Sequence, residues 1–270
     1  MYDVAEHQLS VVVPTRNEAA MIGPFLDALL PALEGIDAEV IFVDDSSDGT
    51  PAAVEKSARR STRPIRLHHR PAHERAGGLG GAVKVGFEAA RGRFVAVMDA
   101  DLQHPPAVLP LMLAAAAPIG GADLVIGSRF TGAGGVGEFG YVRRAVSQGA
   151  ASLARIFFPR RLVAVTDPMS GLFLVRRERL AVDELRPHGF KILLELLVRS
   201  APLRVAEVPY TFGERVAGES KASLREGLNY LVHLLRLRLG LGRAKARALV
   251  AREERDRVGD IRLGVARILE

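Results

Sequence analysis

The sequence predicts an α/β fold built on a doubly wound, mostly parallel sheet. Two short, almost wholly apolar and β-branched runs, residues 10–14 and 39–44, end in polar residues, as strands buried on both faces do. Between them, apolar residues of segment 18–33 recur at helical spacing. Strands and helices then alternate along the chain, which is typical of parallel sheets that bind ligands beyond the carboxyl ends of their strands.

The remaining elements follow in order. Helices are expected at 50–60, 79–90 and 106–116, alternating with strands at 65–68, 93–98 and 123–129. A glycine-rich loop, 132–140, then leads to a helix at 141–158, a strand at 172–175, a helix at 191–200, a strand at 204–212 and a final helix at 223–239 with leucines along one stripe. We predict one domain over residues 1–222, followed by an amphipathic helix and a basic tail over 223–270.

Composition excludes several classes of protein. Of the 270 residues 48% are apolar, which is ample for a core, and none is cysteine, so any metal must use oxygen or imidazole ligands. The longest uncharged stretch is interrupted by prolines and glycines, which argues against a transmembrane helix. The first residues lack the basic-then-apolar order of a secretory signal, so we expect a cytoplasmic protein.

The net charge of +6 is concentrated near the C-terminus. Between Arg236 and Arg257 there are eight basic and three acidic residues. Such a tail can meet anionic lipid headgroups or nucleic acid, or it can be a solvated helix face. No basic strand interleaved with aromatic residues supports nucleic-acid binding, so we expect no nucleic-acid partner. Peripheral membrane contact by the 223–239 helix and the tail is one interpretation, and packing of that helix on the domain is the other.

Two carboxylates one residue apart follow the apolar run 94–98. Asp99 and Asp101 point to the same side of an extended backbone, and Gln103 adds a neutral oxygen. Hard Mg²⁺ or Mn²⁺ accepts these ligands, so the pattern predicts a divalent cation held against a diphosphate. A polar turn is the simpler interpretation of an isolated pair. His104 is expected to pack at the helix start rather than to bind the metal.

Charged residues gather at the predicted carboxyl ends of several strands. A carboxylate at 44 or 45 can accept hydrogen bonds from ribose hydroxyls or a base edge, while Thr50 caps the next helix. These ends meet at one edge of a parallel sheet, and a ligand site is therefore predicted there. The residues concerned are Asp44, Asp45, Asp99, Asp101 and Arg129.

Three segments resemble the family 2 inverting glycosyltransferases, which have the GT-A fold: Pro14-Thr-Arg-Asn-Glu18, Val43-Asp-Asp-Ser-Ser-Asp-Gly-Thr50 and Asp99-Ala-Asp-Leu-Gln-His-Pro-Pro106. Later segments are similar to polyprenol-phosphate mannosyltransferases: Gly127-Ser-Arg129, Asp167-Pro-Met-Ser-Gly171, Gly189-Phe-Lys-Ile192 and Val208-Pro-Tyr-Thr-Phe212. The resemblance extends over residues 9–239 and makes 1–222 the expected catalytic domain.

The resemblance implies a role for individual residues on the donor side. Pro14, Arg16, Glu18 and Asp44 would line the nucleotide pocket, with Asp45 close behind. Arg16 stands where this family often has tyrosine, so stacking on the base is not expected there. Asp99, Asp101 and Gln103 would hold the metal, Mg²⁺ or Mn²⁺, on the donor diphosphate, and Arg215 and Lys221 would close over the donor from a loop.

On the acceptor side, the resemblance implies that Arg129 and Arg143 grip the lipid phosphate. Ser147 is counted among the substrate-binding residues, and Asp101, Arg129 and Arg143 are the expected catalytic residues. Asp167 has two interpretations, a general base for a hydroxyl acceptor or an organiser of its own turn.

A phosphate monoester is already anionic near neutral pH, so it can attack an anomeric carbon without a strong base. The expected reaction is inverting transfer of mannose from GDP-mannose to a polyprenyl phosphate at the cytoplasmic membrane face. One alternative is UDP-glucose as the donor, and another is a hydroxyl group as the acceptor. A separate protein that anchors the chain to the membrane is a further possible partner.

Overall fold

The computed structural model describes residues 6–117, 121–132, 135, 141–187, 189, 191–213, 227 and 230–240. The chain divides into two compact units, Met1–Lys221 and Ala222–Glu270. In the second unit, residues 230–240 are helical. None of the described helices is long and apolar enough to cross a membrane.

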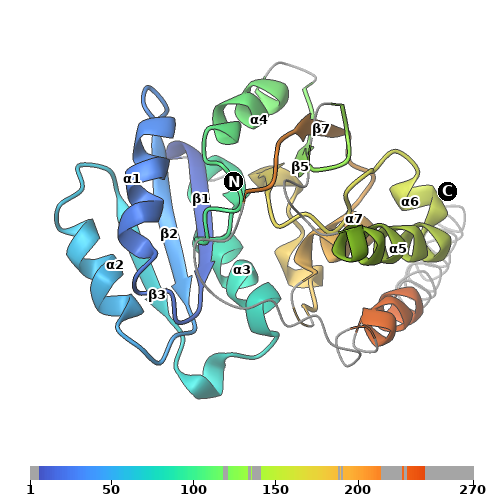
Figure 1. Cartoon of the computed structure of the whole chain (residues 1–270), viewed down its shortest axis with the longest axis horizontal. Coiled ribbons are helices and arrows are strands. Elements are labelled where there is room, and N and C mark those ends of the chain that lie inside the picture. Colours follow the sequence, from blue (N-terminus) through green and yellow to red (C-terminus); the bar gives the residue numbers. More distant parts are fainter. Residues whose placement is uncertain are drawn as a thin grey trace, which may run out of the picture. The chain divides into compact units, whose positions relative to one another are not determined.

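The first unit is built on one sheet of seven strands, in the order β3-β2-β1-β4-β6-β5-β7 (Figure 1). Among the described strands, β6 alone runs antiparallel to its neighbours, β4 and β5. The predicted doubly wound, mostly parallel α/β sheet is therefore confirmed. The strands are β1 (His7–Thr15), β2 (Ala38–Asp44), β3 (Ile65–His69), β4 (Gly92–Val97), β5 (Leu124–Ser128), β6 (Phe173–Arg176) and β7 (Val205–Pro209).

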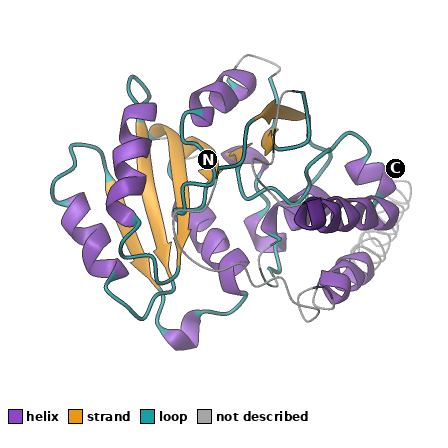
Figure 2. Ribbon diagram, in the orientation of Figure 1, coloured by secondary structure: helices purple, strands orange, loops and turns teal. Residues whose placement is uncertain are grey.

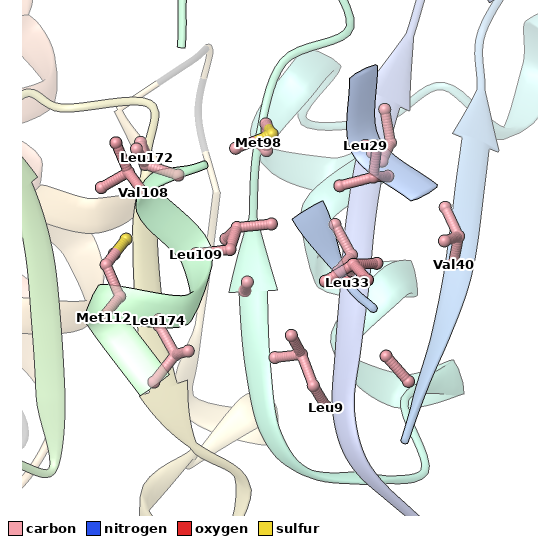
Figure 3. Packing of buried hydrophobic residues seen from close by; sticks show 14 of the residues in the cluster. Leu9, Leu29, Leu33, Val40, Met98, Val108, Leu109, Met112, Leu172 and Leu174 are labelled. Carbon is pink, nitrogen blue, oxygen red and sulfur yellow. The ribbon is translucent and has the colours of Figure 1, made fainter. Parts of the chain in front are cut away.

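Helices connect these strands and cover them (Figure 2). They are α1 (Ile22–Ala32), α2 (Thr50–Ala58), α3 (Gly78–Ala89), α4 (Val108–Ala116), α5 (Tyr141–Phe157), α6 (Pro159–Leu162) and α7 (Ile192–Arg199). On one face of the sheet, α1 and α4 both contribute to a continuous apolar cluster (Figure 3). Its labelled members include Leu29 of α1 and Leu33 just after it, Leu109 and Met112 of α4, and Leu9, Val40 and Leu174 of the strands.

The other face is covered by α3, which approaches the sheet very closely. A Cβ atom added to Gly86 of α3 would lie 2.2 Å from Val12 Cγ1 of β1. Only glycine fits there. Because α1 and α3 cover opposite faces, every residue of β2 is buried, which explains why that strand reads as an almost continuous apolar run.

Several predicted bounds differ from the structure for local reasons. The helix expected from residue 18 begins at Ile22, because the chain first turns after β1 through Asn17 at a φ of 58°. The strand expected over 204–212 ends at Pro209, and Thr211 makes only an isolated bridge with Gly135. Proline lacks the N–H that would continue the ladder. Much of the predicted 132–140 loop, the start of the 223–239 helix and the tail beyond 240 lie outside the described residues.

Candidate active site

The carboxylates Asp99 and Asp101 follow β4 directly. The backbone N–H of Gln103 donates to Asp101 Oδ1 at 3.0 Å, and Leu102 between them adopts a φ of 59°. Such a left-handed conformation is costly for a bulky residue, of the order of 1 kcal/mol or more, and persists where surrounding structure holds it. Asp101 is buried, whereas the Asp99 side chain is 35% exposed. The turn therefore holds one carboxylate firmly and presents the other.

The space beside Asp99 is kept open by a glycine. A Cβ atom added to Gly171, which precedes β6, would lie 2.9 Å from Asp99 Oδ2 and 3.0 Å from His104 Nε2. The Gln103 side chain donates through Nε2 to the Gly213 carbonyl at 3.3 Å, which leaves Oε1 as its ligand atom. These oxygen donors suit Mg²⁺ or Mn²⁺. Within the described residues, no three His, Cys, Asp or Glu side chains converge on one point, so a cation here would need ligands from substrate or water as well.

His104 is buried beneath this turn. Its Nδ1 atom is 2.8 Å from the Tyr210 hydroxyl, and its Nε2 atom is 3.7 Å from Asp99 Oδ2. Burial raises the pKa of Tyr210 well above its ordinary value, with the nearby charges of Asp167 and Asp99 adding to the rise against the opposing effect of Arg129. The Tyr210 hydroxyl therefore stays protonated, and His104 has the packing position that its sequence context predicts.

Asp44, at the end of β2, is completely buried and already hydrogen-bonded. Its oxygens accept from the Thr15 hydroxyl at 2.9 Å and from the backbone N–H and the hydroxyl of Ser46. His69 Nδ1, at the end of β3, lies 2.7 Å from Asp44 Oδ2. A nucleotide could reach this carboxylate only by displacing one of these partners.

Asp45 is likewise paired within the chain. Both of its oxygens accept from Arg70, through Nε at 2.7 Å and Nη2 at 2.6 Å, and both side chains are buried. Arg70 also donates to the carbonyl of Gly78, where α3 begins, at 3.0 Å. This ion pair fastens the loop that precedes α3 to the end of β2, which is a structural task.

The loop after β1 carries the other predicted nucleotide-binding residues. Pro14 is buried in β1, Arg16 is exposed and Glu18 is half-buried. Asn17 between them joins this loop to the one after β2, because its N–H donates to Ser46 Oγ at 2.7 Å. The exposed Arg16 and half-buried Glu18 are thus presented from a loop with a fixed backbone.

Arg129, directly after β5, contacts a carboxylate and two aromatic rings. Its guanidinium donates to Asp167 through Nε at 2.8 Å and Nη2 at 2.9 Å, and its Cζ atom is 5.2 Å from the ring centroid of Phe130 and 5.4 Å from that of Phe212. Burial alone would lower the pKa of Arg129, but the hydrogen bonds and charge of Asp167 outweigh burial and raise it. Within the described residues, the Nη1 atom of Arg129 has no hydrogen-bond partner, so the edge of the guanidinium that carries this atom can donate to a ligand.

Asp167 is fully buried, and both of its carboxylate oxygens accept hydrogen bonds from Arg129. Its own backbone N–H donates to Glu207 of β7 at 3.2 Å, and the neighbouring Thr166 N–H donates to the same oxygen at 2.7 Å. A carboxylate in this setting is a poor general base, because it is neither exposed nor unpaired. The geometry favours the second interpretation of Asp167, an organiser of its surroundings.

The structure brings together only some of the predicted residues. Arg143 lies in the first turn of α5 and the half-buried Ser147 one turn later, but the Arg143 side chain is outside the described part. Arg215 and Lys221 also lie outside it. Sequence reasoning missed the partners that hold the site, namely His69, Arg70, Phe130, Glu207 and Gly213. A signal existed for Arg70, since it directly follows the edge strand next to the one that ends at Asp44 and Asp45.

Together, these features define a class of protein. A mostly parallel sheet with paired carboxylates after β4 and a largely buried arginine after β5 agrees with the GT-A glycosyltransferase fold. A crystal structure of a mycobacterial protein superposes with a TM-score of 0.65 at 24% identity, covering 88% of this chain and 76% of that one. Glucosyl-3-phosphoglycerate synthase from Mycobacterium tuberculosis, in complex with Mn²⁺, UDP-glucose and phosphoglyceric acid, gives 0.63 at 23% identity, covering 87% and 81%. These likenesses confirm the fold.

Residues 10–181 match the model of glycosyl transferase family 2, and the chain belongs to this family. It is 38% identical over 231 residues to a dolichol-phosphate mannosyltransferase of Pyrococcus furiosus, covering 85% of this chain and 63% of that protein's length. Proteins of the same name from Saccharomyces cerevisiae and Mycosarcoma maydis are 36% and 35% identical, and the chain covers 86% and 80% of their lengths. The family resemblance seen in the motifs is confirmed.

Proposed function

We propose that this protein transfers mannose from GDP-mannose to a polyprenyl phosphate, with inversion at the anomeric carbon. The observation that carries the proposal is the 35–38% identity, over most of this chain, to three proteins named dolichol-phosphate mannosyltransferase. The geometry supports it, because the largely buried Arg129 is linked through the rings of Phe212 and His104 to the carboxylates suited to a cation.

On the donor side, Asp99, Asp101 and Gln103 would hold Mg²⁺ or Mn²⁺. Gly171 leaves room beside Asp99, and the three side chains offer the oxygen ligands that these ions prefer. When bound, the cation would offset negative charge on the departing diphosphate. Pro14, Arg16 and Glu18 would border the nucleotide, while Asp44 and Asp45 would chiefly keep the pocket loops in place. Arg215 and Lys221 would add positive charge on the donor side.

On the acceptor side, Arg129 would bind the lipid phosphate through its free edge, with Arg143 and Ser147 nearby on α5. Arginine is suited to this task because its planar donors match phosphate oxygens. The attacking oxygen is anionic before it binds, so the site has to position it and balance its charge rather than remove a proton. Attack from the face opposite the leaving diphosphate would invert the configuration and yield a β-linked lipid-phosphate mannose.

The pairing of Asp167 with Arg129 distinguishes this reaction from transfer to a hydroxyl. A hydroxyl acceptor needs a base, and Asp167, the carboxylate considered for that role, is buried and bound to Arg129. An anionic acceptor needs the arginine instead. The proposal also places the enzyme on the cytoplasmic face of a membrane through peripheral contact by the basic tail, with or without a separate anchoring protein.

The test is an assay of lipid-linked product. Purified protein is incubated with polyprenyl phosphate, Mg²⁺ or Mn²⁺, and radiolabelled GDP-mannose or UDP-glucose, and label is counted in the organic extract. We expect incorporation from GDP-mannose, which EDTA abolishes. Incorporation from UDP-glucose alone would refute the mannose assignment, and label transferred only to a hydroxyl acceptor would refute the phosphate acceptor.

A further inference from the structure

The ring of Phe212 lies between the two charged regions of the site. One side of it receives the guanidinium of Arg129, whose Cζ is 5.4 Å from the ring centroid. The His104 ring meets Phe212 edge-on, at 5.2 Å between centroids and an interplanar angle of 80°. Phe212 is itself buried. A single aromatic ring thus contacts both the proposed acceptor arginine and the histidine under the metal turn.

The backbone around Phe212 is attached to the metal turn as well. Gly213 N–H donates to the Gln103 carbonyl at 2.8 Å, and the Gln103 side chain returns a hydrogen bond to the Gly213 carbonyl at 3.3 Å. A Cβ atom on Gly213 would lie 3.2 Å from the carbonyl oxygen of Leu102, so the two segments touch closely. A movement of the turn between Asp101 and His104 therefore moves the segment that carries Phe212.

His104 also connects Phe212 to the partly exposed carboxylate of Asp99. His104 Nε2 is 3.7 Å from Asp99 Oδ2, and its other nitrogen is 2.8 Å from the Tyr210 hydroxyl, two residues before Phe212. Asp99 is one of the two carboxylates proposed to hold the metal. Phe212 thus contacts Arg129 of the proposed acceptor site directly, and it reaches Asp99 of the proposed donor site through one intervening residue, His104.

We propose that Phe212 is a positioning residue that couples binding of the metal–nucleotide to binding of the acceptor phosphate; the proposal rests on the function proposed above. A donor that fixes the turn from Asp99 to His104 also fixes the Phe212 ring, and the ring fixes the plane of the Arg129 guanidinium. In this account the same arrangement of the turn, the ring and the guanidinium suits both ligands. Each ligand therefore strengthens binding of the other by the same factor.

The coupling is measured by equilibrium binding, without turnover. Isothermal titration gives the affinity of the full chain for citronellyl phosphate, a short soluble prenyl phosphate, alone and with saturating Mn²⁺ and GDP. In the wild-type protein we expect Mn²⁺ and GDP to increase the affinity roughly fivefold or more. In Phe212→Leu, which keeps an apolar side chain but removes the ring, the ratio of the two affinities should fall to about one.

Phe130→Leu is the matched control. The ring centroid of Phe130 also lies near Arg129, at 5.2 Å from Cζ, but Phe130 has no ring contact with His104 in the described structure. We expect this variant to bind the prenyl phosphate more weakly in both conditions while keeping the wild-type ratio. Phe212→Tyr, which retains the ring, should also keep the ratio, and Phe212→Met replaces Phe212→Leu if the latter does not fold.

Two results would overturn the coupling. One is a ratio near one in the wild-type protein, and the other is a wild-type ratio in the leucine or methionine variant at position 212. Failure of the proposed function would look different from failure of the coupling. In that case the wild-type protein would neither bind the prenyl phosphate nor transfer mannose to polyprenyl phosphate.

Discussion

The two halves of the sheet edge hold their charged side chains in different ways. After β2, Asp44 and Asp45 are buried and paired with donors of their own chain. After β5, Arg129 is largely buried and also paired, but within the described residues its Nη1 atom has no hydrogen-bond partner, and the rings of Phe130 and Phe212 lie near its guanidinium. A charged residue at a strand end is thus not by itself a ligand. Whether it binds substrate or supports the loop depends on how many of its polar atoms the chain already uses.

The largest effect is expected where a carboxylate is proposed to meet the metal. Asp101→Asn should lower kcat about a thousandfold, equivalent to about 4 kcal/mol, because the amide carries no charge to hold the cation. Stability should change by less than about 1 kcal/mol, since the amide oxygen can still accept from Gln103 N–H. Kinetics with Mn²⁺ titration and thermal unfolding measure both quantities.

Asp37→Asn is the control for this variant, because Asp37 is an exposed carboxylate just before β2, at the opposite edge of the sheet. It should leave kcat unchanged. An Asp101→Asn enzyme that works at the wild-type rate without added metal would contradict the assignment.

The next largest effect should appear in stability rather than in catalysis. Arg70→Ala leaves the buried carboxylate of Asp45 without its bidentate partner and should lower the free energy of unfolding by about 3 kcal/mol. Urea unfolding measures this loss. Arg59→Ala removes an exposed pair with Glu55 and should cost at most about 0.5 kcal/mol. Equal losses in the two variants would show that the Asp45 pair is not the support described here.

A smaller effect on turnover is expected from Asp167→Asn. The acceptor phosphate needs no base, so kcat should fall about tenfold or less, through looser positioning of Arg129. The pH profile of kcat should keep its shape. A loss of about 10³-fold or more, together with loss of the acidic limb in which a base would become protonated, would instead identify Asp167 as a general base.

The smallest effect concerns acid stability, away from the site. Arg204 donates to Asp123, and these hydrogen bonds hold the pKa of that carboxyl at about 2, below its ordinary value. Because the folded pKa is the lower one, the pair stabilises the fold above about pH 4 and loses this contribution as the pH falls toward 2. Asp123→Asn should therefore be less stable than wild type at neutral pH, with the difference shrinking in acid. Urea unfolding between about pH 6 and pH 3 would show a constant difference if the account is wrong.

The parallel part of the fold could be predicted from the sequence because its signals are local. Every residue of β2, for example, is buried, and this strand is an almost wholly apolar run that ends at Asp44 and is followed by Asp45. The antiparallel direction of β6 could not be predicted, since the four residues Phe173–Arg176 carry no sign of their orientation. Their partners on β4 and β5 determine it.

From the sequence we could predict that Asp44, Asp45, Asp99, Asp101 and Arg129 lie at or just after the ends of strands of the sheet, but not how these side chains pair. Asp45 and Arg70 are 25 positions apart and meet only because β2 lies beside β3. Arg129 and Asp167 are 38 positions apart and meet across the end of the sheet. The motif containing Asp167 was recognised, yet its carboxylate could be a base or a support until its partner was known. Its burial and its pairing with Arg129 favour a support.

The division into a donor side and an acceptor side is tested most directly by binding two ligands to Arg129→Lys. Lysine keeps the charge but loses the planar donors that match Asp167 and a phosphate together. We predict that the affinity for citronellyl phosphate, measured without donor, falls at least about tenfold, while the affinity for GDP with Mn²⁺, measured without acceptor, stays within about twofold of wild type. Lost binding of GDP with unchanged binding of the prenyl phosphate would contradict the account.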